Sequence, residues 1–164
     1  MPCVLFVLLL VGSAGFLVAT IGAFPDHVAT HFGWGGRADA WMTREGYLAW
    51  MLMFGVAFPV LVTAMVGLLP RAWPGSAFVN VPNREHWFAP ERRAESFAYL
   101  GRHACWLGCL IVLMVAGVHA LILRSHDSTP PTLPLAPFLA LLIGFVIAVG
   151  VWILMLHRKF RRPA

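Results

Sequence analysis

The stretch CVLFVLLLVGSAGFLVATIGA, residues 3–23, contains no charged side chain. Its leucine, isoleucine, valine and phenylalanine side chains favour membrane insertion by about 4 to 7 kcal/mol in total. The stretch also has the ~20 residues that a helix needs to cross about 30 Å of hydrocarbon. We therefore expect a transmembrane helix here. A cleaved secretory signal is the alternative, but no lysine or arginine precedes the stretch, and it is longer than the roughly 7 to 15 residues of a signal's apolar region.

Three further stretches share these properties, at about residues 47–69, 103–123 and 135–156. The chain is 60% hydrophobic and 12% charged, with a mean hydropathy of +0.78, which lies outside the range of soluble globular proteins. The sequence predicts an all-α fold, an integral membrane four-helix bundle that forms one domain over residues 1–164. The remaining segments are an irregular, motif-bearing outer loop 24–46, a second outer loop 124–134, a cytoplasmic loop 70–102 and a basic tail 157–164.

The arginines and lysine predict the orientation, because basic residues in short loops stay on the cytoplasmic side. Nine of them lie in the loop after the second span or in the tail, against three in the other two loops. The nine are Arg71, Arg84, Arg92, Arg93, Arg102, Arg158, Lys159, Arg161 and Arg162, and the three are Arg37, Arg44 and Arg124. We therefore expect a multi-pass protein with both termini in the cytoplasm.

The formal net charge of +5 collects beside membrane helices. Anionic lipid headgroups are the expected partners there, so the charge does not indicate nucleic acid. Small residues at four-residue spacing predict helix packing along the first, third and fourth spans. These are Gly15, Ala19 and Ala23, then Gly101, Cys105 and Cys109, then Ala140, Gly144 and Ala148. For the two cysteines, thiolate metal ligation is the alternative to packing. No cysteine is expected in an oxidising loop.

Two local features shape the second span and the cytoplasmic loop. Pro59 is expected to bend the second helix. The loop begins with turn-forming residues, and Pro90 followed by Glu91 predicts the start of a helix that continues to Leu123. The segment from Asn83 to Arg93 is predicted to form an interfacial elbow, in which Arg84, Arg92 and Arg93 pair with Glu85, Glu91 or Glu95 and with lipid phosphate.

Two separated motifs resemble a known family. The outer one consists of Pro25, Val28, His31, Phe32, Gly36, Asp39 and Trp41, and the inner one is NVPNREHWFAPERRAES, residues 80–96. Both resemble the SdpI-like immunity family of small membrane proteins, which carry a domain of unknown function (DUF1648). The resemblance implies a bacterial inner-membrane protein with roles in immunity or signalling, although the best-known relatives have additional spans. It implies no catalytic residue.

The outer loop supports two interpretations. His27 and His31 are four residues apart, a spacing that suits a divalent metal, with Asp26, Asp39 and His119 as further ligands. A structural interpretation is favoured over this metal site: Pro25 ends the first helix, and His31 and Asp39 tie the loop together by hydrogen bonds. In that interpretation Phe32, Trp34 and Trp41 lie against the bundle.

The function predicted from these features is non-enzymatic. We expect a small accessory, immunity or sensing protein that recognises a membrane protein or peptide through its extracytoplasmic loop, without a cofactor. Residues predicted to bind a partner or to hold the motifs are Pro25, His31, Phe32, Asp39, Trp41, Asn83, Arg84, Trp87, Pro90, Glu91, Arg92 and Arg93. The alternative is a membrane metalloenzyme whose outer His/Asp site activates water.

Overall fold

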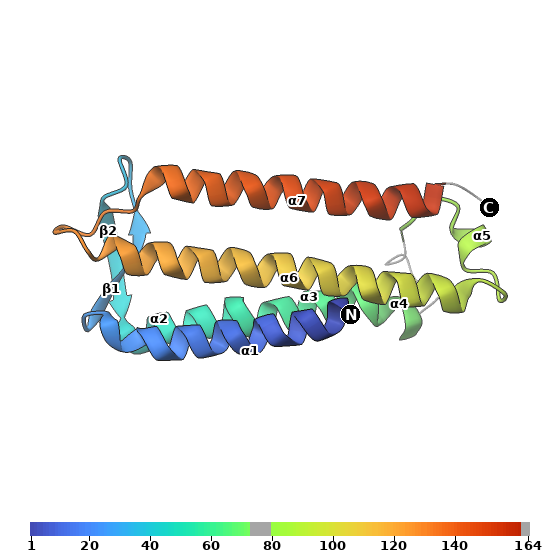
Figure 1. Cartoon of the computed structure of the whole chain (residues 1–164), viewed down its shortest axis with the longest axis horizontal. Helices are drawn as coiled ribbons and strands as arrows, with labels where there is room; N and C mark the ends of the chain where they lie inside the picture. Colours follow the sequence, from blue (N-terminus) through green and yellow to red (C-terminus); the bar gives the residue numbers. More distant parts are fainter. Residues whose placement is uncertain (73–79, 162–164) are drawn as a thin grey trace.

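The computed structural model describes residues 1–72 and 80–161. It contains four helical segments that are long and apolar enough to span a membrane, which confirms the predicted bundle (Figure 1). The first is α1 (Pro2–Thr20) with the short 3-10 turn η1 (Ile21–Ala23). The second joins α2 (Arg44–Leu52), η2 (Met53–Ala57), α3 (Phe58–Gly67) and α4 (Leu69–Ala72). The third and fourth are α6 (Arg93–Ser125) and α7 (Leu135–Arg161).

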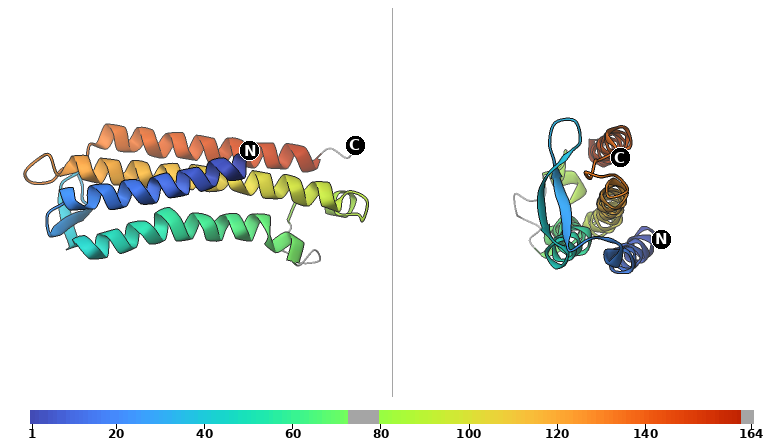
Figure 2. Two further views of the ribbon diagram at one scale, coloured as in Figure 1. Left: turned by 60° about the horizontal axis from the view of Figure 1, so that its bottom comes forward. Right: turned by 90° about the vertical axis from the view of Figure 1, so that its left-hand side faces the viewer.

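Helix α6 lies at the centre of the bundle, with α1 and α3 on one side and α7 on the other (Figures 1 and 2). Small residues let the backbones approach. A Cβ on Gly108 would lie 2.5 Å from the ring of Phe6 on α1 and 2.4 Å from Oγ1 of Thr63 on α3. Cys105 and Cys109 are buried beside Phe6, as the packing interpretation of the third span predicts.

The glycines of the other two small-residue stripes make no such close approach. No described atom outside the local chain lies within 4 Å of a Cβ built on Gly15 of α1 or Gly144 of α7. Helix α7 instead meets α6 through His103 and Trp152. Nε2 of His103 lies 2.9 Å from the carbonyl oxygen of Trp152, Nε1 of Trp152 donates to the carbonyl of His103 at 2.8 Å, and the rings stack.

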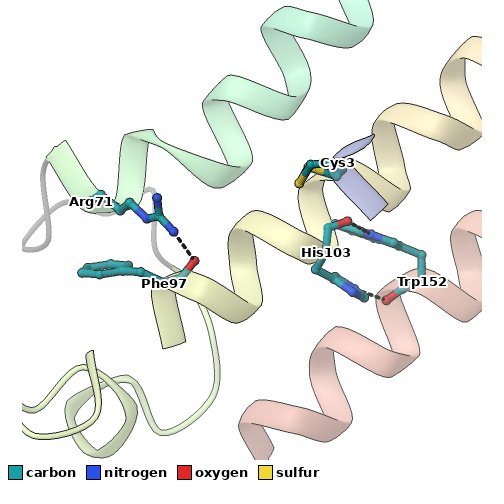
Figure 3. Close-up of a disulfide and its surroundings, with 6 residues drawn as sticks. Cys3, Arg71, Phe97, His103 and Trp152 are labelled. Atoms are coloured by element: carbon teal, nitrogen blue, oxygen red, sulfur yellow. Dashed lines mark hydrogen bonds between the residues drawn. A yellow bond between two sulfur atoms is a disulfide. The ribbon is translucent and has the colours of Figure 1, made fainter. Parts of the chain in front are cut away.

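A disulfide joins α1 to α6 through Cys3 and Cys105, a pairing that the sequence analysis did not predict (Figure 3). The two cysteines are separated by 102 positions in the sequence, so neither motif nor spacing indicates that they meet. Cys109 is the free cysteine and is buried. The interpretation of Cys105 as a packing residue alone is therefore corrected.

Pro59 interrupts the second span as expected. The residues before it form the π-helical turn η2, in which the amide of Phe58 bonds to the carbonyl of Met53, five residues back. A proline has no amide hydrogen and its ring displaces the carbonyl four residues earlier, so a wider turn at this point accommodates it.

The connection between the second and third spans differs in detail from the prediction. Helix α5 (Arg84–Trp87) precedes the long helix, and α6 begins at Arg93 rather than at Pro90. The amides of Arg92 and Arg93 both bond to the carbonyl of Ala89, which makes a turn of the residues between. Part of the predicted turn-forming half of the loop, residues 73–79, lies outside the described residues.

Candidate functional site

The first outer loop is a β-hairpin, where an irregular segment was expected. Strand β1 (His27–Phe32) pairs antiparallel with β2 (Ala38–Thr43), and the register shifts on both sides of His31. Such bulges break the two-residue alternation by which a strand is recognised in a sequence. The available signal was the glycine-rich GWGG between two segments that contain aromatic and β-branched residues.

Glycines make the turn of the hairpin possible. Gly35 and Gly36 have φ angles of +88° and +80°, in the region that favours glycine. A Cβ on Gly33 would lie 2.6 Å from a carboxylate oxygen of Asp39, and one on Gly36 would lie 2.9 Å from the carbonyl oxygen of Leu133. The turn therefore approaches both its own second strand and the second outer loop.

Arg44 fixes the base of the hairpin. Its guanidinium donates to the carboxylate of Asp26 at 3.1 Å and to the carbonyl of Phe24 at 3.2 Å, while its amide donates to the carbonyl of Asp26 at 2.9 Å. The hydroxyl of Thr43 then caps α2 by accepting from the amide of Gly46 at 3.2 Å. The strand-to-helix transition is thus held on both sides.

The second outer loop covers the edge of β2. The amide of Ala38 donates to the carbonyl of Pro131 at 3.1 Å, and the amide of Leu133 donates to the carbonyl of Gly36 at 2.8 Å. Arg37 and Thr132 form a bridge between these two bonds. An exposed strand edge invites pairing with other chains, and this loop occupies the first part of it, at residues 36–38.

His126, at the end of α6, is bonded to β1. Its Nε2 accepts the amide of Ala29 at 3.2 Å, and its Nδ1 lies 2.9 Å from the carbonyl of Ile122. Since a carbonyl only accepts, Nδ1 carries the hydrogen and Nε2 is the free acceptor. The bond to Ala29 therefore requires neutral His126.

His119 occupies the core beneath the hairpin. The hydroxyl of Thr20 donates its one hydrogen to the carbonyl of Phe16 at 2.7 Å, so it accepts from Nε2 of His119, also at 2.7 Å. Nδ1 of His119 is then the acceptor for the hydroxyl of Tyr47 at 2.8 Å. His119 has no exposed surface, and its hydrogen bonds join α1, α2 and α6.

The outward surface of the hairpin combines aromatic and polar side chains. Trp34 at the turn is fully exposed, so the prediction that it lies against the bundle is wrong; Trp41 is half exposed and belongs to none of the buried clusters of the described residues. Phe32 does pack against the buried cluster below. Nδ1 of His31 bonds to the carboxylate of Asp39, as predicted, and both side chains remain exposed. Figure 2 shows the hairpin lying across the end of the bundle.

The five predicted metal ligands do not converge. Asp26 is paired with Arg44 at the base of the hairpin, His31 is paired with Asp39, His119 is enclosed in the core, and His27 is exposed at the start of β1. Within residues 1–72 and 80–161, no three His, Cys, Asp or Glu side chains are placed to hold a metal ion together. A catalytic zinc needs about three such ligands and an open position.

The inner motif caps the end of α7. Asn83, whose φ of +52° is one that asparagine tolerates, donates to the carbonyls of Phe160 and Arg161 at 3.1 and 3.0 Å. Nε1 of Trp87 donates to the same Phe160 carbonyl at 2.8 Å. The last carbonyls of a helix lack partners within the helix, so these side chains supply them.

Trp87 is buried against Phe160 and Leu100. Lys159 lies over its ring, 4.5 Å from the centroid, and pairs with Glu95 at 3.0 Å. The partner of Glu95 is thus on α7 and not one of the arginines of the predicted elbow. Of the inner-motif residues predicted to bind a partner, Arg84 is partly buried, whereas Asn83, Pro90, Glu91, Arg92 and Arg93 are exposed.

Comparison with known proteins identifies the segment that carries the hairpin. Residues 8–55 match the family model of a domain of unknown function, DUF1648. The DUF1648 segment runs from α1 through the hairpin to η2 and contains Thr20, Asp26, His31, Asp39 and Tyr47. Its polar groups bond to His119 of α6 and to His126, which directly follows α6, and both histidines lie outside the matched segment. The inner motif also lies outside the match. No curated protein and no solved structure matches the chain.

Proposed function

We propose that this multi-span membrane protein recognises a protein or peptide partner through its hairpin. The observation that carries the proposal is a rigid base beneath an exposed aromatic surface. Arg44, His126 and the second outer loop fix the backbone, while Trp34 and Trp41 stay uncovered. Tryptophan is enriched among residues that dominate binding energy at protein interfaces, and a pre-organised backbone lowers the entropy cost of binding.

The proposed setting is the inner membrane of a bacterium, with the hairpin outside and both termini in the cytoplasm. The role that suits such a protein is that of an accessory, immunity or sensing subunit. On the cytoplasmic side, exposed Arg92 and Arg93 are proposed to contact anionic headgroups, because each basic side chain near an anionic leaflet contributes about 1 kcal/mol.

Photo-crosslinking in native membranes tests recognition by the hairpin. A photoreactive residue replaces Trp41, and a second version places it at Val146, an exposed position on α7. The expected result is one product of fixed mass from position 41, formed with a protein or peptide, and none from position 146. Mass spectrometry of the product identifies what was captured.

A second substitution separates recognition from accidental contact. The product from position 41 is expected to disappear in Trp34→Ala and to persist in Arg124→Gln, which alters an exposed residue at the same end of the bundle. Lipid adducts alone at position 41 would contradict partner recognition and would make the tryptophans a membrane anchor instead.

A further inference from the structure

A groove lies between α1, α3 and α6, at the end of the bundle away from the hairpin. Its volume is about 450 Å³, within the usual range for ligand sites. The walls are mainly apolar and include Phe6, Val60, Ala64 and Ala98. The Cys3–Cys105 disulfide forms part of the lining, so a covalent bond holds α1 beside α6 there.

Two arginines line the same groove. Arg71, at the end of the second span, donates from Nη2 to the carbonyl of Phe97 on α6 at 3.1 Å, as Figure 3 shows. Arg102 lies on α6, and both side chains are exposed. Among residues 1–72 and 80–161, carboxylates form ion pairs with His31, Arg44 and Lys159. No carboxylate in these ranges pairs with Arg71 or Arg102. Within the part of the chain that the structure describes, both positive charges at the groove therefore lack an ion-paired carboxylate.

The depth of these groups matches the two parts of a phospholipid. Arg71 lies at the end of the second span, and Arg102 directly precedes the charge-free stretch 103–123 of the third, so both are expected near the level of headgroups, whereas Val60 lies within α3, deeper in the second span. A free anion would contact only the arginines, and an uncharged acyl chain would contact only the apolar wall. A phospholipid would contact both. Basic pockets between transmembrane helices recognise anionic headgroups by this combination.

We propose that the groove is a binding site for one anionic glycerophospholipid. The phosphate lies between the guanidinium groups of Arg71 and Arg102, and one acyl chain runs along Phe6 and Val60. This site is separate from the hairpin and from the exposed arginines of the inner motif, and it does not depend on the function proposed above.

Native mass spectrometry of the purified full chain in a zwitterionic detergent tests the site. Phosphatidylglycerol and phosphatidylcholine with the same acyl chains are added at equal concentration, and inorganic phosphate is added in a separate sample. We expect one phosphatidylglycerol adduct to be retained preferentially and no phosphate adduct. Equal retention of both lipids, or retention of phosphate alone, would overturn the proposal.

Charge-matched variants localise the headgroup. Arg71→Gln with Arg102→Gln is expected to lower the preference for phosphatidylglycerol by roughly tenfold or more, because both headgroup contacts are lost. The control pair, Arg158→Gln with Arg161→Gln, removes two exposed charges from α7 and leaves the groove intact. Its preference should stay within about twofold of the wild type. An equal loss in both pairs would mean general attraction to basic residues and would refute the site.

A groove-filling variant localises the acyl chain while keeping both arginines. Ala98→Phe is expected to abolish the retained adduct. Val60→Trp fills the groove from the opposite wall and replaces Ala98→Phe if that variant does not fold. Because Val60 is 45% exposed, folding is expected to tolerate the larger side chain there. Wild-type retention in the folded filled variant would contradict the proposed position of the chain.

Discussion

His126 holds the hairpin to the bundle through one ring nitrogen. In His126→Ala the amide of Ala29, a residue with no exposed surface, loses its acceptor. An unpaired buried amide costs about 1–3 kcal/mol, so β1 should open more often. Hydrogen–deuterium exchange of peptides that cover β1 is therefore expected to be faster in this variant. Asp127→Ala, at the exposed neighbouring position, serves as the control and should exchange like the wild type. Unchanged protection in His126→Ala would mean that the hairpin is held without this bond.

Tyr47 supplies the donor for the acceptor nitrogen of His119. Tyr47→Phe keeps the ring in the core but leaves Nδ1 of His119 unpaired, at a cost of about 1–3 kcal/mol. The midpoint of thermal unfolding in detergent should fall accordingly. Tyr99→Phe removes a hydroxyl with a long, exposed bond of 3.4 Å to Met155 and should shift the midpoint much less. Equal shifts in the two variants would show that the buried network adds no specific stability.

At the scale of elements, apolar length predicted the four spans, because a bilayer requires about 20 apolar residues in each helix. The same argument says little about segments outside the hydrocarbon. The hairpin was missed because bulges beside His31 remove its alternation. The α7 cap was missed because Asn83 and Trp87 act on carbonyls more than seventy positions away.

The candidate site was predictable only where its partners are close in sequence. His31 and Asp39 are eight positions apart and lie on either side of a turn, so their bond could be foreseen. The contacts of Thr20 and Tyr47 with His119 are 99 and 72 positions apart. These contacts depend on which faces of α1, α2 and α6 meet in the bundle. A single sequence does not specify how the helix faces are paired. The described residues likewise bring no three of the predicted metal ligands together, since lying on the same side of the membrane does not place side chains in contact.

The disulfide between α1 and α6 can be tested directly by counting free thiols. The chain has three cysteines, of which Cys109 is free. Protein that is denatured without reductant and treated with a maleimide polymer should take up one tag, and reduced protein should take up three. Cys3→Ser serves as the control, because it frees Cys105 and should take up two tags under both conditions. Three tags on the unreduced wild type would show that the bond does not form.

In the whole molecule, α6 joins two differently built ends. At one end its histidines complete the polar core of the DUF1648 segment. At the other end Leu100 packs with the inner motif and α7, and Gly101 and Arg102 line the groove. Helix α6 is also longer than a bilayer requires, with 33 residues. One central helix therefore lets a short chain organise surfaces on both sides of a membrane.

Two features give opposite predictions of which end of the bundle faces the cytoplasm. Nine basic residues against three favour the α5 end, whereas a disulfide near that end is more typical of an oxidising compartment. We expect the charges to decide, because they act while the helices insert and the disulfide forms only once α1 and α6 have met. A membrane-impermeant maleimide should then label Trp34→Cys in intact cells and Glu91→Cys only after permeabilisation. Both positions are exposed, and the native cysteines are bonded or buried. The reverse labelling would place the hairpin in the cytoplasm and would exclude recognition of an extracytoplasmic partner.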